Sequence, residues 1–183
     1  CDYATRIWVN GQLVAQHLGG YTPICVEVTD ALQAGDNAIT ICAEDDTRSP
    51  LQPAGKQSKR YGSYGCLYTR TTGIWQTVWL EPVPRTYIAD LRVLPDLGGG
   101  TVRLEAELAG DASRGTLAAQ VSLEGAAVAS GSVRYAGSRA TLTLAIPDPQ
   151  PWGPGHPVLY DLDVTLGTQA GSQDQVRSYV GMR

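Results

Sequence analysis

The sequence predicts an all-β protein, and three observations support this fold class. Apolar and polar side chains alternate over many segments of about four to eight residues, which is the pattern of half-buried strands. The chain contains 21 Gly and 11 Pro among 183 residues, and these residue types mark turns between strands. The composition is 43% hydrophobic and 17% charged, which is enough apolar material for packed cores. This length allows one large domain or two small ones.

The first part of the chain contains alternating segments separated by turn residues. Asn10-Gly11 lies between two of them and favours a tight type I′ hairpin. Ile24, Val26 and Val28 alternate with polar or small residues, which predicts a half-buried strand. Thr29-Asp30 can cap a short helical turn that runs through Leu32. Strands are therefore expected at residues 3–9, 12–17, 24–28 and 39–43.

A β-branched and aromatic stretch, Tyr68–Pro82, is predicted to be a strand buried on both faces. Ile74, Val78 and Leu80 lie on one parity, and Trp75 and Trp79 lie on the other. Such a strand fits the junction between two domains, because one face can pack inside its own β-sandwich and the other face can pack against a second domain. It also fits the central strand of a single sandwich, and the pattern does not separate the two.

Periodicity is lost between Asp45 and Gly65. Long segments without secondary structure are uncommon in compact domains and are usually functional or disordered. This one carries side chains that hydrogen-bond or stack on rings, as sugar binding requires; the alternative is a surface loop with solvated charges. The side chains concerned are Arg48, Lys56, Gln57, Lys59, Arg60, Tyr61 and Tyr64.

The second part of the chain follows a short stiff linker, Pro82-Val83-Pro84. Short alternating segments with Gly or Pro between them predict a sandwich of immunoglobulin type, without the Cys…Trp…Cys pattern of antibody domains. Gly98-Gly99-Gly100 is predicted to be a hairpin turn. Two domains are expected, residues 1–84 and 85–183. The strands of the second are expected at residues 88–94, 102–108, 117–123, 127–134, 142–146, 160–166 and 175–180.

Charge and cysteine spacing argue against several classes of function. The net charge is −4 with no basic run, which argues against binding to nucleic acid or an acidic membrane. No apolar run approaches the roughly 20 residues of a membrane span. The four cysteines lack CxxC spacing, so no metal site is predicted, and they are expected to be free thiols. A cytoplasmic location is therefore expected, with secretion as the alternative. Both His17 and His156 are expected to be structural.

Residues Thr69–Pro82 resemble the end of the sugar-binding domain of glycoside hydrolase family 2, which includes β-galactosidases and β-glucuronidases. Further matches occur in the order of the family, over nearly the whole chain. They are Trp8-Val9-Asn10-Gly11, Gly19-Gly20-Tyr21-Thr22-Pro23, Gly35-Asp36-Asn37, Glu44-Asp45-Asp46, Gly55-Lys56-Gln57, Pro151-Trp152, Leu159-Tyr160 and Gly181-Met182-Arg183. The resemblance implies the later part of a galactose-binding-like jelly roll followed by a complete Ig-like domain. It also implies an interior piece, because the family's sugar-binding domain normally begins upstream of Cys1.

The resemblance implies no catalytic residue in this chain. Family 2 enzymes carry their glutamate pair in a (β/α)8 barrel, which would begin after Arg183 and be the partner of this chain. No phosphate-binding glycine loop or GxSxG motif occurs, and no cofactor is predicted. The resemblance implies non-catalytic accessory β-domains of a family 2 glycoside hydrolase, whose parent enzyme would hydrolyse terminal β-glycosides as a β-galactosidase does. The candidate carbohydrate-binding residues are Asp45, Asp46, Lys56, Gln57 and Arg70. The alternatives are a free-standing carbohydrate-binding module and an Ig-type protein-interaction module.

Overall fold

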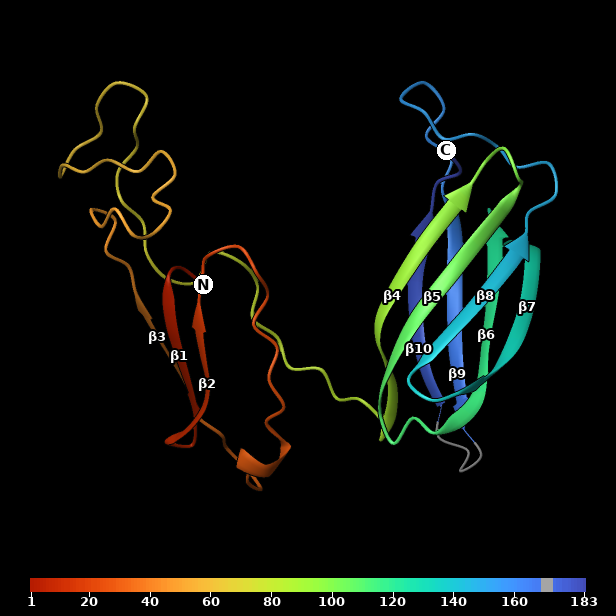
Figure 1. Cartoon of the computed structure of the whole chain (residues 1–183), viewed down its shortest axis with the longest axis horizontal. Coiled ribbons are helices and arrows are strands. Elements are labelled where there is room, and N and C mark those ends of the chain that lie inside the picture. Colours follow the sequence, from red (N-terminus) through yellow and green to blue (C-terminus); the bar gives the residue numbers. More distant parts are fainter. Residues whose placement is uncertain (169–172) are drawn as a thin grey trace. The chain divides into compact units, whose positions relative to one another are not determined.

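The computed structural model describes residues 1–168 and 173–183, and its regular structure is almost entirely antiparallel β-sheet (Figure 1). The chain divides into two compact units, Cys1–Leu80 and Glu81–Arg183, whereas the sequence prediction placed the boundary after Pro84. The described residues include no helix with the length and hydrophobicity needed to cross a bilayer.

The first unit contains one sheet of three strands in the order β2-β1-β3. The strands are β1 (Ala4–Val9), β2 (Gln12–Leu18) and β3 (Ile39–Glu44). Asn10 and Gly11 join the first two with φ values of 50° and 83°, so the predicted type I′ hairpin is confirmed. The predicted helical turn is present as the 3₁₀ helix η1 (Thr29–Ala31), but the capping predicted for Thr29-Asp30 is wrong, because Val28 occupies the N-cap position and no side chain caps the turn.

The strand predicted at residues 24–28 is wrong. Ile24, Val26 and Val28 are half-buried and alternate with exposed Cys25 and Glu27, so the side chains follow the predicted pattern. The backbone of this segment nevertheless pairs with no strand. Alternation reports which side chains face inward, but a strand also requires a neighbouring backbone as hydrogen-bond partner.

The buried strand predicted at Tyr68–Pro82 is also wrong. Its described pairings are two isolated bridges, Asp2↔Gly73 and Gln57↔Tyr68, and residues 74–84 form no strand. Trp75 is 54% exposed and Trp79 is 69% exposed. The physical reason is that the unit has no second apolar layer, because Val9 is its one fully buried apolar side chain among the described residues. The stretch therefore has the composition of a central strand without a sheet to cover it.

The second unit is a seven-stranded antiparallel sandwich, and each strand predicted for it is present. One sheet has the order β4-β5-β8 and the other β10-β9-β6-β7. The strands are β4 (Thr86–Asp96), β5 (Thr101–Gly110), β6 (Arg114–Leu123), β7 (Ala126–Ala136), β8 (Arg139–Ala145), β9 (Tyr160–Thr168) and β10 (Gln173–Val180). The Gly98-Gly99-Gly100 turn lies between β4 and β5, as predicted.

The two sheets of the second unit enclose the main hydrophobic core (Figure 1). Alternate side chains of β5 and β8 meet alternate side chains of β6 and β9, among them Leu104, Leu142, Leu117 and Val164. This arrangement follows from the period-2 pattern, since each strand places one set of side chains inward. The fourth strand of the unit, β7, pairs with β6, whereas constant-type immunoglobulin domains place it on the opposite sheet.

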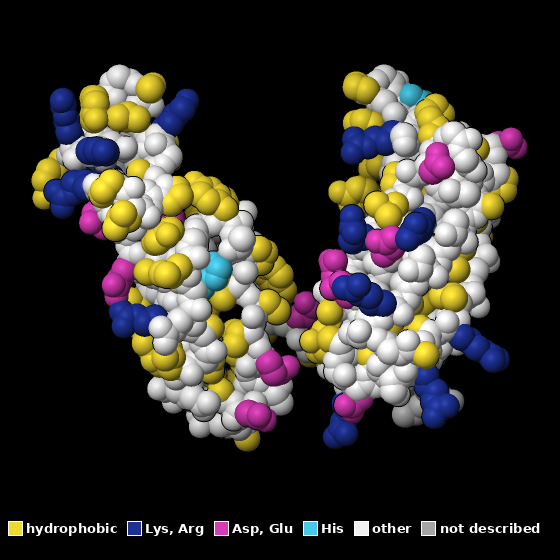
Figure 2. Space-filling model, viewed as in Figure 1, with side chains coloured by type: hydrophobic (Ala, Val, Ile, Leu, Met, Phe, Trp, Pro, Cys, Tyr) yellow, Lys and Arg dark blue, Asp and Glu magenta, His cyan; other side chains and the backbone are white. Residues whose placement is uncertain are grey.

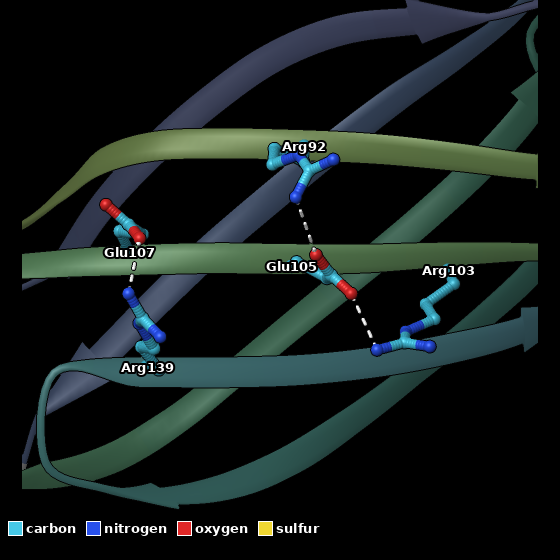
Figure 3. Close-up of polar contacts among 5 residues, drawn as sticks. All are labelled: Arg92, Arg103, Glu105, Glu107 and Arg139. Atoms are coloured by element: carbon cyan, nitrogen blue, oxygen red, sulfur yellow. Dashed lines mark hydrogen bonds and ion pairs between the residues drawn. The ribbon is translucent and has the colours of Figure 1, made fainter.

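Ion pairs cover the outer face of the three-stranded sheet (Figure 3). Glu105 of β5 pairs with Arg92 of β4 and with Arg103, and Glu107 pairs with Arg139 of β8. Each arginine is at least half exposed, so one pair contributes only about 0–1 kcal/mol of stability. This face has the character of a solvated surface.

Candidate functional site

A hollow of about 330 Å³ lies within the first unit. Four segments build it: Asp2 before β1, the turn after β2, the long loop after β3, and the extended stretch that follows that loop. Its lining residues are Asp2, Gly20, Tyr21, Gln57, Tyr68, Thr71, Thr72, Gly73, Ile74 and Trp75. Aromatic surface with a few polar groups is the usual lining of a small-molecule site.

Three aromatic side chains supply the walls of the hollow. The rings of Tyr21 and Trp75 meet edge to face, with centroids 6.0 Å apart. The indole Nε1 of Trp75 donates a hydrogen bond of 2.9 Å to the Gly20 carbonyl, which fixes the ring against the turn after β2. Tyr68 is half exposed and supplies the third ring. Such rings can pack against the apolar face of a sugar while the polar groups bind its hydroxyls.

The long loop is anchored by two buried polar side chains. Gln57 is 7% exposed, and its Oε1 accepts a hydrogen bond of 2.8 Å from the Thr71 amide. Ser58 is fully buried, donates from Oγ to the Gly62 carbonyl at 2.7 Å, and accepts from the Arg60 amide at 3.0 Å. Because buried polar groups are costly unless they are hydrogen-bonded, these contacts give the loop a defined shape.

Asp45 and Asp46 have different surroundings, although they are adjacent in sequence. Asp45 is half-buried, accepts a hydrogen bond from Nε2 of the Gln52 side chain, and accepts a second from the Thr72 hydroxyl at 3.3 Å. Since Thr72 lines the hollow, Asp45 borders it. Asp46 is exposed, and its carboxylate accepts from the Arg48 amide at 3.2 Å, which caps the turn that opens the loop.

Asp2 brings a second carboxyl group close to Asp45. Burial raises the pKa of the Asp2 carboxyl above its usual value, and the Asp45 carboxylate raises this pKa further. Asp2 is the one charged side chain among the lining residues. In the described parts of the chain, no group of three or more His, Cys, Asp or Glu side chains is arranged to hold a metal ion.

The structure brings together some of the predicted site residues and separates others. Gln57 lines the hollow, and Asp45 borders it. Asp46, Lys56 and Arg70 are not among the lining residues; Lys56 is exposed, and the Arg70 guanidinium lies 5.2 Å from the centre of the Tyr61 ring.

Sequence reasoning missed all three aromatic wall residues of the hollow, Tyr21, Tyr68 and Trp75. Trp75 was predicted to be buried in a strand, and its partner Tyr21 comes from a distant turn. The available signal was the Gly19-Gly20-Tyr21 sequence, in which an aromatic residue directly follows a strand-breaking turn. It indicates an exposed ring but gives no information about which segment that ring meets.

Comparison with protein families matches residues 86–183, more than half of the chain, to the family described as glycosyl hydrolases family 2. A Formosa agariphila protein assigned by name as a β-glucuronidase is 27% identical over 98% of this chain and 21% of its own length. A β-galactosidase of Thermoanaerobacter pseudethanolicus is 25% identical over 97% of this chain and 24% of its own length. The chain thus spans about a quarter or less of these relatives.

Solved structures show the same fold. A glycosyl hydrolase family 2 member from Bacteroides cellulosilyticus covers 99% of this chain with a TM-score of 0.73 and 19% identity, and the match takes up 23% of that protein. β-Glucuronidase 2 of Bacteroides uniformis covers 99% with a TM-score of 0.71 and 21% identity, again over 23% of its chain. Both units of the present chain therefore have counterparts within larger proteins.

Proposed function

The chain belongs to glycosyl hydrolase family 2, and we propose from this premise that it is a non-catalytic accessory part of a hydrolase of that family. The observation that carries the proposal is the share of each relative's length to which this chain aligns. Nearly all of this chain aligns to each relative, but it accounts for only 21% and 24% of the β-glucuronidase and β-galactosidase relatives named above. The remaining length of such a protein is where a catalytic barrel would lie.

The proposed parent enzyme hydrolyses terminal β-glycosides, in keeping with relatives named β-galactosidase and β-glucuronidase. Hydrolysis of a glycosidic bond needs two carboxyl groups at a defined separation, one on each side of the scissile bond. Asp45 already accepts two hydrogen bonds from its own unit, and this favours a supporting role over a nucleophilic one. The carboxyl pair would come from the barrel.

The first unit would be the later part of the family's sugar-binding jelly roll, and the second its Ig-like domain. In this proposal the hollow between Tyr21, Tyr68 and Trp75 holds a sugar ring, and Gln57 and the Asp45 region supply polar contacts. The four cysteines are free, which supports a reducing compartment such as the cytoplasm as the proposed location.

The proposal is tested by assaying the purified chain on nitrophenyl β-galactoside and nitrophenyl β-glucuronide. We expect no hydrolysis above background, because the catalytic carboxyl pair would lie in another part of the parent. Hydrolysis that is lost when Asp2 or Asp45 is replaced by Asn would show that the chain is itself an enzyme.

A free-standing carbohydrate-binding module is the second candidate, and the aromatic hollow favours it, since that hollow is formed within the first unit alone. The two proposals differ in what the chain does outside a parent enzyme. Tight binding of galactosides or glucuronides by the isolated chain, measured by titration calorimetry, would favour the module. An accessory domain that completes the rim of a barrel should bind monosaccharides weakly or not at all.

A further inference from the structure

The positive charge of the first unit is concentrated in one segment. Between Thr47 and Leu80 there are five cationic side chains and no Asp or Glu, although the whole chain has a net charge of −4. Both lysines of the protein are in this segment. The cations all fall within residues 47–70, which we call the basic loop, and they are Arg48, Lys56, Lys59, Arg60 and Arg70. Figure 2 shows Lys and Arg side chains gathered over the loops of this unit.

The cations of the basic loop differ from the arginines of the second unit in their partners. On the three-stranded sheet, Arg92, Arg103 and Arg139 each pair with a glutamate (Figure 3). No cation of the basic loop forms an ion pair with any acid of residues 1–168 or 173–183. The acids next to the loop are otherwise engaged, since Asp45 accepts from Gln52 and Thr72, and Asp46 accepts from a backbone amide. The basic loop therefore carries cationic side chains that no ion pair among the described residues engages.

Aromatic rings and buried anchors hold part of this charge in place. The Arg60 guanidinium lies 4.3 Å from the centre of the Tyr64 ring, and that of Arg70 lies 5.2 Å from the Tyr61 ring. The backbone of Lys56 accepts from the Tyr68 amide at 3.0 Å, so Lys56 is fixed beside a residue of the hollow. Side chains ordered before binding lose less conformational entropy when a ligand arrives.

We propose that the basic loop binds the anionic groups of an acidic glycan whose sugar ring occupies the neighbouring hollow. The ligand class is a carbohydrate that carries carboxylate or sulfate groups. Arginine suits both, because its planar guanidinium donates paired hydrogen bonds to carboxylate-like oxygens, and lysine adds a point charge. Asp2 is the one carboxyl in the hollow, so the anionic group is expected on the loop cations and the neutral ring face on the aromatic side chains. This inference rests on the proposed role of the chain in a glycoside hydrolase.

The test measures binding of the whole chain to soluble polysaccharides by affinity electrophoresis and titration calorimetry. Polygalacturonate presents carboxylates, dextran sulfate presents sulfates, and unmodified dextran and galactan are the neutral references. We expect the chain to bind at least one acidic polymer and to bind the neutral polymers at least roughly tenfold more weakly. Binding should weaken as salt rises from about 0.05 M to about 0.5 M, because exposed charges are screened. The two acidic polymers decide between carboxylate and sulfate.

The informative variant is Lys56→Gln with Lys59→Gln, because neither ammonium makes a described contact that folding would lose. It should weaken binding roughly threefold to tenfold, as expected for the loss of two exposed charge contacts. The matched control is Arg114→Gln with Arg134→Gln, which removes the same charge from exposed positions on the second unit. This control should bind like the unmodified chain if the loop, and not the total charge, carries the affinity.

Three results would overturn the inference. Equal binding of acidic and neutral polymers would remove the role of charge, and equal weakening by the two variants would remove the role of the loop. Binding of single-stranded polyadenylate as tightly as the best acidic glycan would identify the loop as a general polyanion surface. None of these results affects the hydrolysis assay, so failure of this inference is distinguishable from failure of the accessory function.

Discussion

At the scale of single residues, Gly110 is the position where the sandwich depends most directly on the absence of a side chain. It ends β5 opposite the first residues of β4, with a φ of +73°. A Cβ at this position would overlap the carbonyl oxygen of Arg85, a backbone atom that cannot move aside without disturbing the start of β4. That carbonyl also accepts a 2.9 Å hydrogen bond from the Asp111 amide, which any such movement would strain.

We therefore predict that Gly110→Ala strongly destabilises the second unit, and thermal unfolding measures the effect. The control is Gly125→Ala, since Gly125 has a φ of +81° but an added Cβ there would meet no atom within 4 Å. Both variants carry the roughly 1 kcal/mol cost of a left-handed alanine. The Gly110 variant should lose roughly 1–3 kcal/mol more from steric overlap. Equal losses would show that the Arg85 carbonyl does not restrict this position.

A second residue-scale prediction compares Asp45 with Asp46. Asp45 connects the start of the basic loop to Gln52 and Thr72, whereas Asp46 caps one exposed turn. Asp45→Ala should destabilise the first unit by about 1–3 kcal/mol, because it leaves part-buried donors unpaired, and Asp46→Ala should cost about 0.5–1 kcal/mol. Urea unfolding of the first unit, followed by tryptophan fluorescence, measures both.

The same two variants in an active parent enzyme would show which acid contributes to kcat/KM. If both variants keep the kcat/KM of the unmodified enzyme, neither acid takes part in substrate recognition.

At the scale of elements, the sequence predicts the second unit far better than the first. Strands such as β5 and β9 alternate strictly, so their inward and outward faces can be read locally. Residues 24–28 show the same alternation but pair with nothing, because backbone pairing depends on distant segments. For the candidate site, the loop and Gln57 were predictable from polarity and lost periodicity. The meeting of Tyr21 with Trp75 was not, since no local pattern encodes a contact between two remote turns.

The extended stretch after the basic loop allows an element-scale prediction. Trp75 packs on Tyr21 and donates to the Gly20 carbonyl, whereas Trp79, four positions further along the stretch, is 69% exposed. Trp75→Ala should therefore destabilise the first unit by about 1–3 kcal/mol, through the lost hydrogen bond and ring contact. Trp79→Ala should change stability by less than about 0.5 kcal/mol, as expected at an exposed site. Thermal unfolding of both variants makes the comparison, and a large loss for Trp79→Ala would show that this ring is covered in solution.

At the scale of the whole molecule, the two units differ sharply in how much apolar surface they bury. Val9 is the one fully buried apolar side chain described in the first unit, and all the others belong to the sandwich of the second. Burial of apolar surface is the main favourable term in folding, so the two units should differ in stability by a wide margin. The first unit also leaves the outer edges of β2 and β3 unpaired in its three-stranded sheet.

We predict that limited proteolysis digests the first unit and spares the second. Thermolysin is a suitable protease because it cuts before apolar residues, whereas trypsin would favour the basic loop through its five cations and not through local unfolding. Mass spectrometry should identify a resistant fragment that begins near Glu81 and contains β4 to β10, because opening the sandwich exposes its whole core. Thermolysin also finds exposed apolar sites in the second unit, such as Leu94 and Leu159. Earlier cleavage of the first unit would therefore reflect its smaller buried apolar core, and not a lack of cleavage sites in the second unit. If the first unit resists cleavage equally, then its apolar stretch at residues 74–80 must be covered in solution, and gel filtration would show whether a second copy of the chain covers it.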